Sequence, residues 1–122
     1  MKILKLVPAL ILSFTLLSEV YAAQKKLSPQ LEKLFQGPLL DSNGKEVDKN
    51  VLAGKTIGIY FSAHWCPPCK KFTPVLSKAY TQLKAERHDD FELIFVSSDR
   101  DQTSFDEYWN EMAFCALPFD DR

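Results

Sequence analysis

The feature that most constrains this chain is a pair of cysteines, Cys66 and Cys69, separated by two residues. The pair follows an apolar run, residues 56–61, and precedes a stretch with helical periodicity. Cysteines at this spacing can close a small disulfide ring and can cycle between dithiol and disulfide. Cys66 is expected at the amino end of the helix, where unpaired amides and the helix dipole stabilise a thiolate. A strand, this motif and a helix in that order predict a thiol–disulfide redox site.

The residues around the two cysteines also suit the start of a helix. Pro67 and Pro68 have no amide hydrogen and a fixed φ, so they fit the first helical turn. Cys69 then falls one turn later, within reach of Cys66. Pro74 lies inside the same helical stretch, and we expect it to kink the helix. A static disulfide, or two buried thiols, is the plainer alternative for the two cysteines.

Three separated segments of the chain resemble one family in the same order. Residues 60–74 have the sequence YFSAHWCPPCKKFTP, residues 91–101 have the sequence FELIFVSSDRD, and further matching residues lie between 105 and 122. Together these segments are similar to the thioredoxin superfamily and, within it, to the tryparedoxin and nucleoredoxin branch. The likeness covers roughly residues 39–122, and it is specific because several motifs match in order.

The resemblance implies an α/β, thioredoxin-like fold with a βαβ core built on central parallel strands. It also implies roles for the motif residues. Cys66 is the attacking nucleophile and Cys69 the resolving cysteine, and no cofactor is expected. Trp65 shields the sulfurs and offers a flat contact surface, with a core aromatic as the alternative. Three prolines support the site: Pro67, Pro68 and Pro74.

The resemblance ends before the family's fold does. A thioredoxin-like fold continues with a strand that follows a cis-proline, then an antiparallel strand and a final helix. Pro118 is a poor match to that proline, because residues 117–119 resemble an earlier segment. We therefore expect residues 39–122 to form a partial domain that lacks the C-terminal strand–strand–helix part. A fragment, a truncated reading frame and a variant completed by a partner all fit this pattern, and the activity of the chain alone is left open.

A second departure concerns the proton of the second cysteine. Many thioredoxins carry a buried aspartate six residues before the first cysteine, and this aspartate accepts a proton from the second. Tyr60 takes that position here. We expect the proton to leave by another route, through water or through Glu92, and a surface-pointing Glu92 is an equal alternative.

The remaining pattern predicts one domain of alternating strands and helices. Ser28 and Pro29 are suited to cap and start a short helix in an N-terminal extension, residues 23–38. Apolar residues at spacings of three and four predict a helix over residues 67–86. The order of strands and helices predicts a right-handed parallel βαβ unit. The other expected elements are an extended piece at 39–40, a turn at 41–44, a strand at 56–62 buried on both faces, a strand at 91–96, and a helix at 104–112 capped by Asp99 or Thr103.

The first residues are typical of a targeting segment. Residues 1–5 are basic, residues 6–17 are apolar, and residues 20–22 end in the small-residue pattern of a cleavage site. We expect residues 1–22 to be a cleaved signal peptide, so that the mature protein is secreted or periplasmic and has no stable membrane span. An uncleaved anchor and a buried amphipathic helix are the alternatives, although the apolar stretch is short against the about 20 residues that a spanning helix needs.

The charge of the chain argues against one class of partner. It has 15 basic and 16 acidic residues, a net charge of −1, and no basic patch of the kind that binds nucleic acid. We expect protein disulfides or dithiols as substrates, with a membrane electron carrier as donor if the protein is a reductant. Redox potentials at this cysteine spacing span about −270 to −120 mV, so the direction of electron flow is left open.

Three other functions compete with an exported thiol–disulfide oxidoreductase. The first is a non-catalytic binding module or inactive fragment that holds a partner on its aromatic surface. The second is a peroxidase, whose threonine should precede the first cysteine by three residues, whereas Thr73 follows the motif. The third is a zinc or copper site, for which we expect no metal because four ligands in a suitable spacing are needed. The side chains on offer are Cys66, Cys69, Cys115, His64 and His88.

Two further residues each have two interpretations. Cys115 is left over once the motif cysteines pair, and it is either a small buried apolar residue or a thiol with a redox or intermolecular role. His64 either stabilises a nearby thiolate and moves protons, or is an exposed loop residue without such a role.

Overall fold

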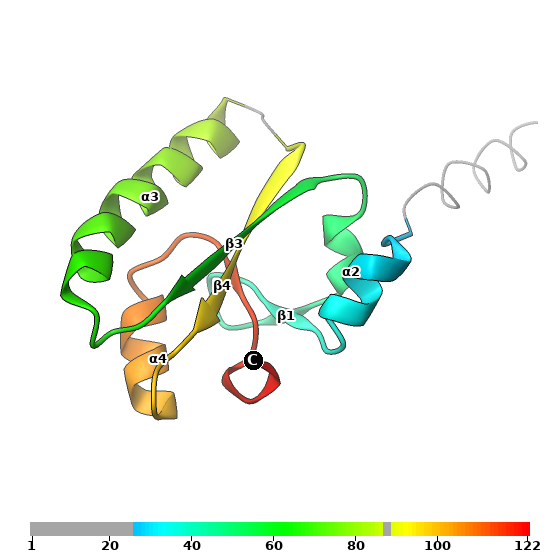
Figure 1. The fold of residues 1–122 in the computed structure, drawn as a ribbon. Coiled ribbons are helices and arrows are strands. Elements are labelled where there is room, and N and C mark those ends of the chain that lie inside the picture. Colours follow the sequence, from blue (N-terminus) through cyan, green and yellow to red (C-terminus); the bar gives the residue numbers. More distant parts are fainter. Residues whose placement is uncertain (1–25, 87–88) are drawn as a thin grey trace, which may run out of the picture.

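The computed structural model describes residues 26–86 and 89–122. The predicted signal peptide, residues 1–22, lies outside this part of the chain. Figure 1 shows strands flanked by helices. In chain order the elements are helix α2 (Pro29–Leu34), strands β1 (Leu39–Leu40) and β2 (Glu46–Val47), 3-10 helix η1 (Lys49–Leu52), strand β3 (Thr56–Ser62), helix α3 (Pro67–Ala85), strand β4 (Phe91–Ser97), helix α4 (Gln102–Trp109), strand β5 (Cys115–Ala116) and 3-10 helix η2 (Phe119–Asp121).

The described strands form one mixed sheet in the order β2-β1-β5-β4-β3. β3 and β4 run parallel, in a register that pairs Thr56 with Phe91 and Ser62 with Ser97. β4 and β5 are also parallel, whereas β1 is antiparallel to both of its neighbours. Helices α3 and α4 lie on one side of the sheet and α2 on the other (Figure 1). The predicted parallel unit of strand, helix and strand is therefore confirmed.

Local chemistry explains the elements before the motif. The Ser28 hydroxyl accepts a hydrogen bond from the Leu31 amide at 3.4 Å, and Pro29 opens α2, as predicted. In the hairpin between β1 and β2, Asp41 Oδ1 accepts from the amide of Lys45 at 3.0 Å and from another turn amide. Gly44 adopts a positive φ of 78°, which a residue with a Cβ avoids. The predicted turn is confirmed.

Each face of the sheet has its own apolar core. The core under α2 combines residues from α2, the strands and η1: Leu27, Phe35, Leu39, Leu52, Ile94, Val96 and Leu117. The core under α3 and α4 is mainly aromatic: Phe95, Phe105, Tyr108, Trp109, Met112, Phe114 and Ala116. Neighbouring residues of β4 alternate between the two cores, so β4 is buried on both faces, as a central parallel strand should be.

Strand β3 lies at the edge of the sheet, so the prediction that it is buried on both faces is wrong. The exposed fraction of Phe61 is 68% and that of Ile59 is 38%. The predicted apolar face of α3 is also only partly covered. Leu76 and Tyr80 pack on the aromatic core, whereas the remaining large apolar residues of that face are exposed: Phe72, Val75 and Leu83. Among the described residues, no strand lies beyond β3 to cover this side of the helix.

Two details after β4 differ from the prediction. Helix α4 runs from Gln102 to Trp109 rather than over residues 104–112, and its N-cap is Asp101, which accepts from the Ser104 amide at 2.8 Å. Neither Asp99 nor Thr103 caps it. Strand β5 was not predicted, since two residues are too short to show a periodicity. It nevertheless occupies a central place between β1 and β4.

Candidate redox site

The cysteine motif lies where β3 gives way to α3. Cys66 is the N-cap residue of α3, with φ −97° and ψ 102°, and Pro67 and Pro68 form its first turn. Cys66 and Cys69 are joined in a disulfide, with their Cα atoms 5.2 Å apart. The structure thus brings the two predicted redox residues together at the amino end of a helix of 19 residues.

The two prolines reduce the number of backbone N–H groups that this helix end can donate to a cysteine sulfur. Neither proline has an N–H, so among the first three helical positions only Cys69 has an amide hydrogen. The Lys70 amide donates to the Cys66 carbonyl at 3.0 Å and closes the first turn. The helix dipole still places partial positive charge beside Cys66, and we expect this to stabilise its thiolate when the disulfide is reduced.

Trp65 offers an open aromatic surface beside the disulfide. The exposed fraction of its side chain is 60%, so the alternative of a core aromatic is wrong. Its indole Nε1 donates to the carbonyl of Ser98 at 3.1 Å, and this holds the ring against the loop after β4. The ring is thus oriented by one hydrogen bond and remains accessible to a partner.

A buried carboxylate anchors the loop that carries the motif. Asp99 has an exposed fraction of 3%, and its Oδ1 accepts from the His64 amide at 2.7 Å. Its Oδ2 accepts from the Ser97 hydroxyl at 2.8 Å, and Arg122 donates to its backbone carbonyl. From the sequence, Asp99 was expected only as one of two possible caps of the next helix, with Thr103 as the other, and this anchoring role was missed. The usable signal was its place directly after a buried strand, at the strand end where the motif also lies.

His64 is tied to charged neighbours rather than standing alone in an exposed loop. Its Nε2 lies 3.0 Å from Lys70 Nζ. Because an ammonium can only donate, Nε2 is the acceptor, and the proton of the neutral ring is on Nδ1. Nδ1 lies 3.9 Å from Glu107 Oε2. His64 therefore links the first turn of α3 to α4.

Four hydroxyl groups are hydrogen-bonded to one another next to the turn that carries Cys69. We call them the hydroxyl cluster: Tyr60, Ser62, Thr73 and Tyr108. The hydroxyl of Tyr60 lies 2.9 Å from Thr73 Oγ1, and that of Tyr108 also contacts Thr73 Oγ1. The Ser62 hydroxyl lies 2.8 Å from that of Tyr108. Thr73 Oγ1 donates to the carbonyl of Cys69 at 3.0 Å. Many thioredoxins have a buried aspartate at the position of Tyr60. In this chain that position is part of a network of uncharged hydroxyl groups.

Glu92 does not lie on a proton route from the motif. It is buried, with an exposed fraction of 6%, so the surface-pointing alternative is wrong as well. Its carboxylate accepts from the Tyr80 hydroxyl at 2.6 Å and from Lys84 Nζ at 3.2 Å. Glu92 pairs with Ile57 near the start of the two parallel strands, whereas the motif follows their carboxyl ends. About five residues at roughly 3.3 Å each separate the two places.

Cys115 is a free cysteine on β5. It is half-buried and packs against the core under α2. Burial, reinforced by the charge of Glu92, raises the pKa of its thiol to about 11. The environment favours the interpretation of Cys115 as a small apolar residue, because a thiol with this pKa carries little thiolate at neutral pH.

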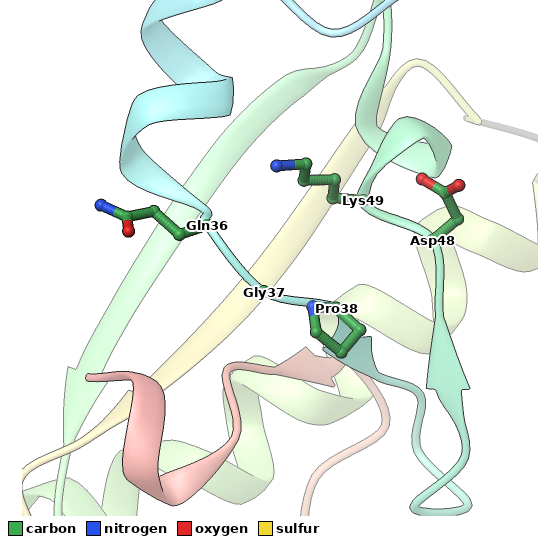
Figure 2. Close-up of a pocket in the computed structure, with 5 residues that line it drawn as sticks. All are labelled: Gln36, Gly37, Pro38, Asp48 and Lys49. Carbon is green, nitrogen blue, oxygen red and sulfur yellow. The ribbon is translucent and has the colours of Figure 1, made fainter.

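A hollow of about 270 Å³ lies between the end of α2 and η1 (Figure 2), and no motif residue lines it. It is lined by Gln36, Gly37, Pro38, Asp48 and Lys49. Lys49 Nζ donates to the carbonyl of Phe35 at 2.8 Å. Its positive charge therefore lies at the carboxyl end of α2, where it stabilises the helix. Within residues 26–86 and 89–122, no three metal-ligating side chains gather, and no helix has the length and apolar character needed to cross a membrane.

Comparison with known proteins adds a family, relatives and solved structures. The thioredoxin-like family model matches residues 54–122. Probable nucleoredoxin 1 of Arabidopsis thaliana is 50% identical over 111 residues, which cover 88% of this chain and 19% of that protein. Tryparedoxin II from C. fasciculata superposes with a TM-score of 0.67 at 40% identity, covering 75% of this chain and 63% of that one. Tryparedoxin II complexed with glutathionylspermidine gives a TM-score of 0.62 at 40% identity, covering 70% and 58%. The chain thus spans about a fifth of the length of the curated relatives it matches.

Proposed function

The chain belongs to the thioredoxin-like family, and on this premise we propose that it is an oxidoreductase that exchanges its Cys66–Cys69 couple with protein disulfides and dithiols. The likeness to nucleoredoxin and tryparedoxin confirms the predicted branch and the α/β fold, and it supports a thiol–disulfide redox role. The observation that carries the proposal is the Cys66–Cys69 disulfide at the amino end of α3, beside the exposed Trp65 ring.

The proposed exchange runs in two balanced steps. The Cys66 thiolate attacks one sulfur of a substrate disulfide, which forms a mixed disulfide and releases the other substrate sulfur as a thiolate that takes up a proton. Cys69 then loses its proton to water and attacks the Cys66 sulfur. The ring disulfide forms, the mixed disulfide breaks, and the second substrate thiol leaves. The substrate disulfide is reduced and the protein dithiol is oxidised, and the reverse sequence oxidises a substrate.

The surroundings of the three cysteines support a different role for each in the proposed exchange. Cys66 is half-buried at the helix end, beside the exposed Trp65 and two exposed prolines. Cys69 is one turn further into the helix, where its carbonyl is held by Thr73. Cys115 has a raised pKa and lies in a strand away from the motif. This arrangement favours Cys66 as nucleophile and Cys69 as resolving residue, and it gives Cys115 no step in the exchange.

Alkylation of the reduced chain tests the assignment of the nucleophile. At pH 7 iodoacetamide should modify Cys66 first and Cys115 last, because only the thiolate reacts and a thiol with pKa about 11 is ionised to about one part in ten thousand. Peptide mass spectrometry reads the three rates. Equal rates at the three cysteines would contradict the assignment.

A turnover assay separates exchange from simple binding. With dithiothreitol as the stoichiometric reductant, the acceleration of insulin reduction by the chain should be abolished by Cys66→Ser and kept by Cys115→Ser, the matched control. If Cys66→Ser retained the wild-type rate, the alternative of a non-catalytic binding module would stand instead. A low-molecular-weight disulfide, tested in parallel, asks whether small thiols are a second substrate class, as the complex of tryparedoxin II with glutathionylspermidine suggests.

Export is part of the proposal and rests on residues 1–22 alone. The basic start, the apolar stretch and the small residues before position 23 support a cleaved signal peptide. In an extracytoplasmic setting, a membrane electron carrier is the donor that we propose for a reducing role. N-terminal sequencing should give a mature chain that begins at Ala23 or Gln24. Intact Met1 in the soluble cytoplasm would contradict export.

A further inference from the structure

The exchange steps above make no use of the hydroxyl cluster, although it is among the most deeply buried polar groups of the described chain. Thr73 and Tyr108 have exposed fractions of 0%, and Ser62 has 4%. The cluster joins three elements, because Tyr60 and Ser62 lie on β3, Thr73 on α3 and Tyr108 on α4. Buried hydroxyls are costly unless they are paired, and every hydroxyl of the cluster has a hydrogen-bond partner.

The direction of each hydrogen bond in the cluster follows from one fixed donor. A hydroxyl has one proton and two lone pairs. Thr73 must donate to the Cys69 carbonyl, since a carbonyl only accepts. Its two lone pairs then accept from Tyr60 and from Tyr108. The Tyr108 oxygen in turn accepts from Ser62. All four protons therefore point along the network toward the backbone of Cys69.

Pro74 explains why the turn that carries Cys69 needs side-chain hydrogen bonds to hold it. It directly follows Thr73 inside α3 and has no amide hydrogen, so it cannot donate to the carbonyl of Lys70, four residues earlier. The helix ladder is thus interrupted one residue after Cys69. The side chain of Thr73 makes a bond to the Cys69 carbonyl, and the two tyrosines attach that side chain to β3 and α4.

We infer that the hydroxyl cluster positions Cys69: it holds the turn that carries the resolving sulfur against β3 and α4, and so sets the stability of the Cys66–Cys69 disulfide. The inference rests on the proposed function and names positioning residues for it. Tyr60, Thr73 and Tyr108 act through the backbone of Cys69 and take no part in the bond changes. Burial raises the pKa of Tyr108, whereas at Tyr60 the hydrogen bonds of the cluster outweigh burial and lower the pKa from 10.0. The cluster positions Cys69 through the hydrogen bonds that these hydroxyls donate.

The cluster should raise the effective concentration of the Cys69 thiol at Cys66, and this quantity can be measured. The equilibrium of the ring disulfide against glutathione reports this quantity. A turn that is held in place presents Cys69 to Cys66 more often than a turn that is free to move. Loss of the cluster should therefore lower the equilibrium constant for closing the disulfide, and it should prolong the life of the mixed disulfide on Cys66.

The experiment equilibrates the full chain with reduced and oxidised glutathione, quenches it by alkylation and reads the redox states by mass. Tyr108→Phe and Thr73→Val remove hydroxyls while keeping most of the side-chain volume. Each should lower the constant by about threefold to tenfold, where tenfold is a potential 29.6 mV more oxidising. Thr73→Ser, which keeps the hydroxyl, should restore the wild-type value. Tyr80→Phe is the matched control, since its hydroxyl binds Glu92 at the other end of the strands.

The outcomes separate this inference from the proposed function. A wild-type chain without a reversible couple would overturn the proposed function, and the inference with it. A normal wild-type couple that Tyr108→Phe and Thr73→Val move no more than Tyr80→Phe does would overturn the inference alone. If Tyr108→Phe does not fold, the comparison of Thr73→Val with Thr73→Ser decides, because equal constants in that pair would also overturn it.

Discussion

The two edge strands of the described sheet, β2 and β3, differ in length, charge and cover. β2 has two residues, one of them the exposed, charged Glu46, and it is tied to β1 by a turn that Asp41 organises. β3 has seven residues, none of them charged and none a proline. Short strands, charges and prolines are the usual protection of a sheet edge against pairing with another chain. The β2 edge has this protection, and the β3 edge lacks it.

The surroundings of the two edges sharpen the contrast. Ser77 of α3 bonds to the loop between α4 and β5, so the opposite side of α3 overhangs the β3 edge. That side carries exposed apolar residues: Phe72, Val75 and Leu83. On the other face of β3, Phe61 is exposed as well. A long uncharged edge strand with exposed apolar side chains on both faces is typical of a surface that binds another protein chain.

The largest expected effect is on the free energy of unfolding, and it distinguishes two phenylalanines. Phe35 is buried in the core under α2, with an exposed fraction of 1%, whereas that of Phe61 is 68%. Phe35→Ala should lower the free energy of unfolding by about 3–5 kcal/mol, because it removes a large buried side chain and leaves a cavity. Phe61→Ala should change it by less than about 0.5 kcal/mol. Urea titrations at low protein concentration measure both, and similar losses would mean that Phe61 is covered in solution.

The next effect concerns association through the β3 edge. We expect the isolated chain to self-associate at concentrations of roughly 100 μM, since an unprotected edge and exposed apolar residues favour pairing. Phe61→Lys should weaken association by about tenfold or more, because a lysine on an edge strand opposes strand addition. Glu46→Lys on β2 changes charge at the protected edge and should leave association unchanged. Sedimentation velocity tests both variants, and a wild-type chain that stays monomeric would contradict the prediction.

The smallest effect is a pH response at the protected edge alone. Hydrogen bonds from the amides of Lys45 and Asn43 hold the pKa of Asp41 below its ordinary value of 3.8. The stabilisation of the turn is therefore fully present above pH 3.8 and is lost as the pH falls through the lower folded value. The amide resonances of Lys45 and Asn43 should shift together in this range. Residues 57–61 of β3 have no acidic group, so their amides should not follow that titration.

The motif and its immediate setting were predictable because their causes are local. The apolar run before Cys66 indicates a strand, and the spacing of apolar residues after it indicates a helix. Pro67 and Pro68 suit a first turn through their own covalent geometry. The cap at Ser28 and the turn at Gly44 depend on side chains within four residues of the amides from which they accept. Each of these features was stated from the sequence and confirmed in the structure.

The sequence by itself determined the strand–motif–helix–strand unit and the place of Cys66 at a helix end, because hydrogen bonds and periodicities over a few residues settle them. Tertiary structure alone decided that β5 lies at the centre of the sheet and that β3 lies at its edge. It also decided that Asp99 anchors the motif loop and that Tyr60, Thr73 and Tyr108 meet below Cys69. These residues are separated by up to 48 positions, and no local pattern records which distant groups share one buried site. Burial and long-range pairing follow from how whole elements pack, and that is where the sequence analysis of β3 and Glu92 was wrong.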